Sequence, residues 1–281
     1  MKTLLYSLLL SIIFIVGCNS DKSTEPKSAY DDASISKGGI MFDKFWSVEA
    51  EFNQTDANIA KFSQYGDFFR CKQCHGWDLQ GRNGAYINRG PKTSRPNISD
   101  HDLYTYAQTK TADQIFDAIK SSINRRDIAY DLATYNPTTN STVGDQMPNY
   151  SQLLTDAQIW DLVKFLKEGA IDVTKIYDAT YTGTYPTGSF SFSNVGKDGN
   201  STNGNSFYTS KCFVCHGTDG KLISLEAGKS VGNFTRTKAY EVQHKVKYGQ
   251  LGSAMVGQFD ITLSQMKDLY KALADTTAFP N

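Results

Sequence analysis

Two five-residue stretches of the chain combine a pair of thiols with an imidazole. They read Cys71-Lys72-Gln73-Cys74-His75 and Cys212-Phe213-Val214-Cys215-His216. This spacing places two thiols about one helical turn apart on the same face, where both can add to the vinyl groups of a single haem. The His that follows is then placed to ligate the iron. The pattern predicts two haem c groups, with covalent bonds to Cys71, Cys74, Cys212 and Cys215 and with His75 and His216 as axial ligands.

The same thiol pairs are also compatible with a redox dithiol or with half of a zinc site. A zinc ribbon separates its two pairs by roughly 15–20 residues, whereas Cys74 and Cys212 lie 138 positions apart. A dithiol motif does not require a His directly after its second Cys, yet this sequence has that His twice. Haem attachment is therefore the favoured interpretation, and zinc or dithiol chemistry is the alternative.

Composition limits the classes of function. The formal net charge is zero, so there is no basic excess to favour nucleic-acid binding. The 281 residues allow one or two domains, and two motifs favour two. Four of the five cysteines lie in the motifs and the fifth is Cys18, which leaves none for a structural disulfide.

The N-terminus has the pattern of an export signal. An apolar run over 4–16 follows a short basic start and is too short for a membrane span of about 20 residues. It ends in Ile15-Val16-Gly17-Cys18, which resembles the bacterial lipobox, in which the Cys is lipidated and becomes the first mature residue. The sequence thus predicts a signal peptide over 1–17 and a lipidated tether over 18–35.

Lipid on Cys18 would hold the exported protein to a membrane, facing the periplasm, because each buried acyl CH₂ contributes about 0.8 kcal/mol. Asn19 slightly favours the outer membrane over the inner one. An ordinary secretory signal with an incidental Cys is the alternative.

Residues 36–170 are expected to form the first haem unit. Apolar spacing predicts an amphipathic helix within 38–52, a short helix opened by Thr111 with Ile115, Ile119 and Ile123 on one face, and a helix after Thr155 that ends near Gly169. Thr155 and Gln158 are spaced as a capping box. The polar, turn-rich residues 124–146 read as an insertion or long loop.

Residues 197–281 are expected to form a second unit that repeats the first. Its middle helix is predicted over 240–248 with Val242 and Val246 inward, at an offset of 127 from Ile115 and Ile119. Residues of the last helix recur at an offset of 107: Thr155, Gln158, Ile159, Asp161, Leu162 and Leu166 correspond to Thr262, Gln265, Met266, Asp268, Leu269 and Leu273. Met147 corresponds to Met255 at an offset of 108.

The order of a C-x-x-C-H, a middle helix, a Met-Pro-x-aromatic and a capped last helix is similar to class I cytochrome c domains. The resemblance implies a mainly α fold with two cytochrome c-like helical domains, each around one covalent haem. It also implies that Met147 and Met255 are the sixth iron ligands, although Val256 stands where the first unit has Pro148.

The two units differ in the helix that precedes the motif. In the family a Gly and an aromatic residue stand eight and four positions before the first Cys. Gly204 and Tyr208 fit this rule, whereas the first unit has Ser63 and Asp67 there. We therefore expect the first helix of the first unit to be remodelled.

Several other side chains compete for roles near the iron. His101 and His244 are the two spare imidazoles, and His244 is expected at the surface because it corresponds to the polar Asp117. Met266 is expected in the core. Trp77, Arg82 and Arg95 are candidates for the haem edge or its propionates, or else are packed and solvated residues.

Residues 171–196 read as a linker between the units. The alternation in Ser189-Phe190-Ser191-Phe192-Ser193 predicts a short strand that could pack across both units. Whether the linker is rigid or flexible stays open at this point.

His/Met ligation fills both axial positions and favours Fe(II), which suits one-electron transfer. We expect electrons to pass between a membrane or periplasmic oxidoreductase and a downstream acceptor, through redox partner proteins. One alternative is a dihaem oxidoreductase, similar to thiosulfate dehydrogenases or peroxidases, with the first haem as reaction site. Another is a subunit of a larger complex, with the insertion binding a partner.

Overall fold

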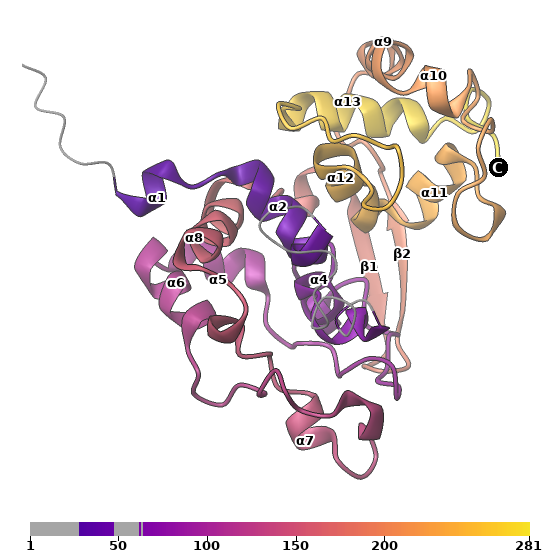
Figure 1. Ribbon diagram of the computed structural model, residues 1–281. Coiled ribbons are helices and arrows are strands. Elements are labelled where there is room, and N and C mark those ends of the chain that lie inside the picture. The colour runs from indigo at the N-terminus through magenta and orange to yellow at the C-terminus, as the bar shows by residue number, and fades with distance from the viewer. Residues whose placement is uncertain (1–27, 48–61, 63) are drawn as a thin grey trace, which may run out of the picture.

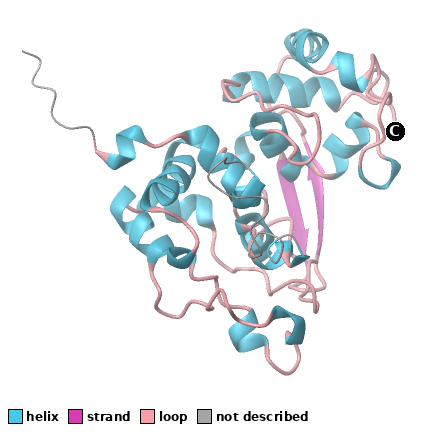
Figure 2. Cartoon of the chain, in the orientation of Figure 1, coloured by secondary structure: helices cyan, strands magenta, loops and turns pink. Residues whose placement is uncertain are grey.

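The computed structural model describes residues 28–47, 62 and 64–281. Over these residues the chain is mainly helical with one two-stranded hairpin (Figure 1 and Figure 2), which confirms the predicted fold class. None of their helices is long and apolar enough to cross a membrane. Cys18, the signal peptide and most of the tether fall outside the described part of the chain.

Short helices and loops surround the first motif. Their bounds are α1 Ala29–Asp32, α2 Ile35–Lys44, η1 Phe45–Ser47, η2 Gly66–Phe68, α4 Cys71–His75, η3 Gly81–Asn83, α5 Leu103–Thr109, α6 Ala112–Lys120, η4 Leu132–Thr134, α7 Ser141–Gly144, η5 Tyr150–Gln152, α8 Asp156–Lys164 and the π-helical turn η6 Phe165–Gly169.

The second half of the chain begins with the hairpin and continues with the helices around the second motif. Their bounds are η7 Val173–Lys175, β1 Asp178–Thr182, β2 Ser189–Ser193, α9 Ser201–Lys211, α10 Phe213–His216, η8 Glu226–Gly228, α11 Val231–Thr237, α12 Ala239–Tyr248 and α13 Leu263–Leu273.

Both predicted capping boxes are confirmed. The Thr155 hydroxyl accepts from Gln158 N at the start of α8, and the Thr262 hydroxyl accepts from Gln265 N at the start of α13. A third box at Thr111 opens α6. Each satisfies backbone N–H groups that the first helical turn leaves unpaired.

The first unit has a first helix, in a place the family spacing did not indicate. Gly38 of α2 lies so close to α8 that a Cβ there would overlap the Asp161 carbonyl oxygen. A Cβ at Gly204 of α9 would overlap the Asp268 carbonyl oxygen of α13 in the same way. The first helix is thus remodelled in its distance along the sequence from the motif, while α2 crosses α8 as closely as α9 crosses α13.

The ends of these two helices are held alike. Ser34 N donates to Asp161 Oδ1 at 2.6 Å, and Asn200 N donates to Asp268 Oδ1 at 2.7 Å. In each unit this residue stands four positions before the Gly. Asp161 and Asp268, which correspond at an offset of 107 in the sequence, therefore accept the equivalent backbone hydrogen bond in the two units.

The predicted strand is β2, which pairs antiparallel with β1. Phe190 and Phe192 pack on Tyr240 of α12, with ring centroids 5.6 and 5.9 Å apart. At the other end of the hairpin, Tyr185 Oη donates to Asn97 Oδ1 at 3.1 Å. The hairpin thus contacts both units. Figure 1 shows it running from the helices around the second motif to the region of α4.

The insertion over 124–146 is folded onto the first unit. The Asp145 carboxylate accepts from Asn97 N at 2.9 Å and also from the Tyr135 hydroxyl. The Arg126 N–H donates to Met147 O at 2.9 Å, which ties the start of the insertion to its end. Ile123 departs from expectation: α6 ends at Lys120, so Ile123 lies beyond the helix and is exposed.

Candidate functional site

Both C-x-x-C-H motifs form one short helical turn that ends at a glycine. The first is α4, which stops at Gly76 with φ +75°, and the second is α10, which stops at Gly217 with φ +79°. Such positive φ angles favour glycine because it has no Cβ. In the first motif both thiols line one cavity, as attachment to one porphyrin requires, whereas in the second motif Cys212 lines the cavity and Cys215 is exposed.

The first motif opens onto two adjoining cavities of about 350 and 420 Å³. Cys71, His75 and Met147 line both of them, and Cys74 lines the larger. The smaller cavity has apolar walls made by Phe42, Leu103, Ile115, Ile119, Leu162 and Leu166. The structure therefore brings the predicted imidazole, thioether and thiols of the first site together.

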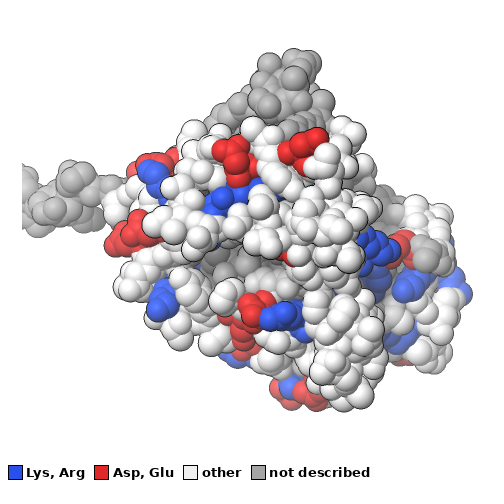
Figure 3. All heavy atoms as spheres, turned by 90° about the horizontal axis from the view of Figure 1, so that it is seen from below, with Lys and Arg blue, Asp and Glu red and all other residues white. Residues whose placement is uncertain are grey.

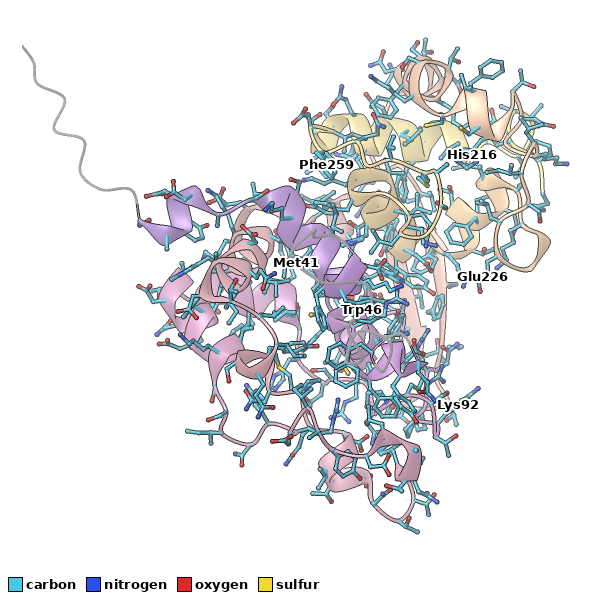
Figure 4. The ribbon with its side chains drawn as sticks, in the orientation of Figure 1. Met41, Trp46, Lys92, His216, Glu226 and Phe259 are labelled. Atoms are coloured by element: carbon cyan, nitrogen blue, oxygen red, sulfur yellow. The ribbon has the colours of Figure 1, made fainter. Side chains whose placement is uncertain are left out.

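The second motif opens onto a cavity of about 260 Å³, lined by Cys212, His216 and Met255. Figure 4 shows His216 between α13 and α11. The apolar walls are made by Val231, Phe234, Val242, Val246, Leu269 and Leu273. Cys215 alone among the predicted residues of this site does not line the cavity.

Equivalent positions line the two sites. Leu162 of α8 and Leu166 of η6 correspond to Leu269 and Leu273 of α13. Ile115 and Ile119 of α6 correspond to Val242 and Val246 of α12. Phe42, four residues after Gly38, corresponds to Tyr208, four residues after Gly204. The residues that correspond in the internal repeat therefore line the cavities of the two units in the same way.

Burial favours the neutral form of both motif imidazoles, which is the form that ligates metals. Burial lowers the pKa of His75 to about 4, and burial also lowers the pKa of His216. A neutral imidazole has a nitrogen lone pair available for iron. In the described part of the chain, neither Nδ1 has a hydrogen-bond partner.

The residues present fit haem c. Each unit contains two thiols, an imidazole and a thioether. The apolar sides of its helices suit contact with the flat surfaces of a porphyrin. The buried guanidinium of Arg126 donates to Phe68 O at 2.9 Å, yet its Nε and Nη1 lack partners among the described residues. Arg126 does not line either cavity, whereas Arg125 lines both and its Nε also lacks a partner among the described residues, so the Arg125 guanidinium suits a haem carboxylate. The described residues contain no cluster of three or more His, Cys, Asp or Glu side chains that could hold zinc.

Other predicted residues take different places. His244 is 2% exposed, so its expected surface position was wrong. Met266 is buried in the core, as predicted. His101 lines the first cavities, although its side chain is largely exposed. Arg82 lines the larger of them and pairs with Asp100.

Two candidates for the haem edge lie elsewhere. Trp77 packs into the core of the second unit, and Arg95 Nε donates to Gly90 O at 2.8 Å. The sequence analysis did not identify Phe42 and Arg125 as residues that line the first site. The signal for Phe42 was present, because Gly38 and Phe42 have the same spacing as Gly204 and Tyr208.

The two motifs differ in exposure. Lys72 and Gln73, between the cysteines of the first motif, are buried. In the second motif Phe213 and Val214 occupy these positions, and Val214 is 81% exposed. The residues between the two cysteines of the second motif are therefore open to solvent, whereas those of the first motif are covered by neighbouring residues.

Comparison with known proteins agrees with this geometry for the first site. Residues 64–170 match the family model described as cytochrome c. That stretch holds the first motif and Met147, and it ends one residue after η6. The chain thus contains a cytochrome c domain, which implies haem c as cofactor and a haem-based role in electron transfer. No curated protein and no solved structure matches the chain.

Proposed function

We propose that this chain is a membrane-tethered dihaem c-type cytochrome. It would carry single electrons between a membrane or periplasmic oxidoreductase and a downstream acceptor. The observation that carries the proposal is the second cavity, which Cys212, His216 and Met255 line and whose first helix α9 packs on α13 as α2 packs on α8. When bound, each haem c supplies one-electron Fe(III)/Fe(II) chemistry.

The side chains supply the rest. With His and Met as its ligands in each unit, the iron would have no open position for a substrate, and the apolar helix faces would limit the rearrangement that accompanies a change of one electron. The acidic and basic side chains on the face in Figure 3 are interspersed rather than gathered by sign. Exchange with redox partner proteins is best supported at the second site, because its motif faces solvent.

The haem count is tested by the mass of the purified exported protein. We expect the polypeptide plus two haems, and we expect the Cys212→Ser/Cys215→Ser double variant to lose one haem while the first stays attached. The Cys71→Ser/Cys74→Ser variant is the matched partner. A wild-type mass with a single haem contradicts the dihaem proposal.

The tether is tested at Cys18. We expect the wild type to fractionate with membranes and Cys18→Ser to be released in soluble form with both haems, because the acyl chains supply the membrane affinity. Ser at a neighbouring position, Asn19→Ser, is the control and should leave the protein on the membrane. Membrane association of Cys18→Ser equal to that of the wild type would disprove lipid anchoring.

The alternative of a dihaem oxidoreductase needs a vacant or displaceable axial position at the first site. Met147 lines that site together with His75, which favours the electron carrier. Rapid binding of CO or cyanide to the wild type would reverse this preference.

A further inference from the structure

We infer that α12 is the shared partition between the two haem sites, and that electrons cross it where Gln243 and His244 contact Trp77 and Phe42. This inference rests on the proposed dihaem function and assigns to these residues a role in transfer between the sites. An electron would leave a ferrous iron in one unit, which becomes ferric, and would reduce a ferric iron in the other to ferrous. No further reactant is needed.

The helix α12 has a different unit on each side. On one side Val242, Lys245 and Val246 line the second cavity. From the same helix, Gln243 and His244 are buried and contact the first unit. Figure 1 shows α12 between α2 and α13. Because an α-helix is about 10–12 Å across with its side chains, this partition is thin.

His244 connects this helix with the wall of the first cavity. Its ring centroid lies 6.0 Å from that of Phe42, which lines the first cavity, and 4.8 Å from that of Trp77. Phe165 lies 5.9 Å away on the same side. The imidazole is thus enclosed by aromatic rings of the first unit, although it belongs to a helix that lines the second cavity.

A second connection runs through the first motif itself. Trp77 follows His75 by two residues, so it is joined to the axial ligand by only the main chain of Gly76. The Trp77 carbonyl oxygen accepts from Gln243 Nε2 at 2.7 Å. Gln243 is next to Val242, which lines the second cavity. Covalent bonds and one hydrogen bond therefore link the axial His of one site to the wall of the other.

The partition is held in position. Tyr248 Oη donates to Gly169 O at 2.8 Å, and Lys247 Nζ donates to the same oxygen at 3.2 Å. The Tyr248 ring also packs closely on Gly39 of α2, leaving no room for a Cβ. Because tunnelling rates fall exponentially with distance, a fixed separation keeps the rate of transfer between the sites constant.

The experiment measures transfer between the sites in the full-length protein with both haems attached. Flash photoreduction delivers less than one electron per molecule, and absorbance follows the redistribution between the haems. A rate that does not depend on protein concentration marks transfer within one molecule. Pulsed electron paramagnetic resonance of the fully oxidised protein reports dipolar coupling between the irons independently of any transfer.

We expect strong coupling in the wild type and a several-fold slower redistribution in His244→Leu and in Trp77→Leu. His244→Phe keeps a ring in the cage and should recover most of the rate. Phe116→Leu removes a ring of α6 that is stacked on Trp160, and it is the matched control. Figure 1 shows α6 on the far side of α8 from α12. Haem content, midpoint potentials and dipolar coupling should be unchanged in all four variants.

Unchanged redistribution in both Leu variants, with two haems and wild-type coupling, would overturn the inferred path and leave the dihaem function intact. Absence of coupling between two attached haems would overturn the shared partition. A protein with a single haem would instead contradict the proposed function, which the mass measurement shows separately.

Discussion

Met147→Ala is expected to lower the midpoint potential of one haem and to remove half of the long-wavelength Met–Fe(III) charge-transfer band. The thioether stabilises Fe(II), and its loss leaves His75 as the one predicted iron ligand in that cavity. We expect a shift on the order of 0.1 V, within the roughly 0.8 V that axial ligands set. Met255→Ala should do the same to the other haem.

Two buried methionines provide the controls. Met41 and Met266 are fully buried in the cores of the first and second units and line neither cavity. Figure 4 shows Met41 on α2. Met41→Leu and Met266→Leu should leave both the band and the potentials in place, since Leu and Met have similar volumes. Persistence of the full band in Met147→Ala would show that another side chain is the ligand, with His101 the first to examine.

The cavity positions of the predicted ligands could be anticipated because their sequence signal is local. A C-x-x-C-H spans only five residues, and the resemblance to class I cytochrome c domains singled out Met147 and Met255 by their place before two capped helices. Their role as iron ligands stays a prediction. The side chains that line the cavities also followed from the repeat, since residues at equal offsets face equivalent surroundings when the units fold alike.

The position of His244 was not predictable in this way. The offset pairs it with Asp117 on α6, whose corresponding face is not covered by another unit. In the second unit that face is covered by Phe42, Trp77 and Phe165. An internal repeat predicts the contacts that each unit makes within itself. It does not predict a contact between the units, because that contact covers a surface of one unit while the equivalent surface of the other unit stays uncovered.

The first helix of the first unit shows a different limit. Spacing from the motif was the criterion, and Ser63 and Asp67 failed it. The physical requirement is instead that a Gly allows two helices to cross closely and that an aromatic residue one turn later reaches the haem cavity. Gly38 and Phe42 meet this requirement from 33 and 29 positions before Cys71, because the intervening chain does not have to be short.

Substitution of either crossing glycine is therefore expected to destabilise its own unit. A methyl group at Gly38 would displace the Asp161 carbonyl, and one at Gly204 would displace the Asp268 carbonyl. Overpacking of this kind typically costs about 1–3 kcal/mol. The matching loss in thermal stability is at least about 4 °C for a domain of this size.

The site of the damage distinguishes the two variants. Because Phe42 follows Gly38 by one helical turn and lines the first cavity, Gly38→Ala should disturb the haem bound at Cys71 and leave the other unchanged, and Gly204→Ala should do the reverse through Tyr208. Gly66→Ala is the control, since its Cβ would meet Trp46 only at 3.4 Å. Differential scanning calorimetry with haem absorbance follows both effects. If Gly204→Ala were destabilised and Gly38→Ala were not, α2 would not be the counterpart of α9, and the two units would share their motifs without sharing their fold.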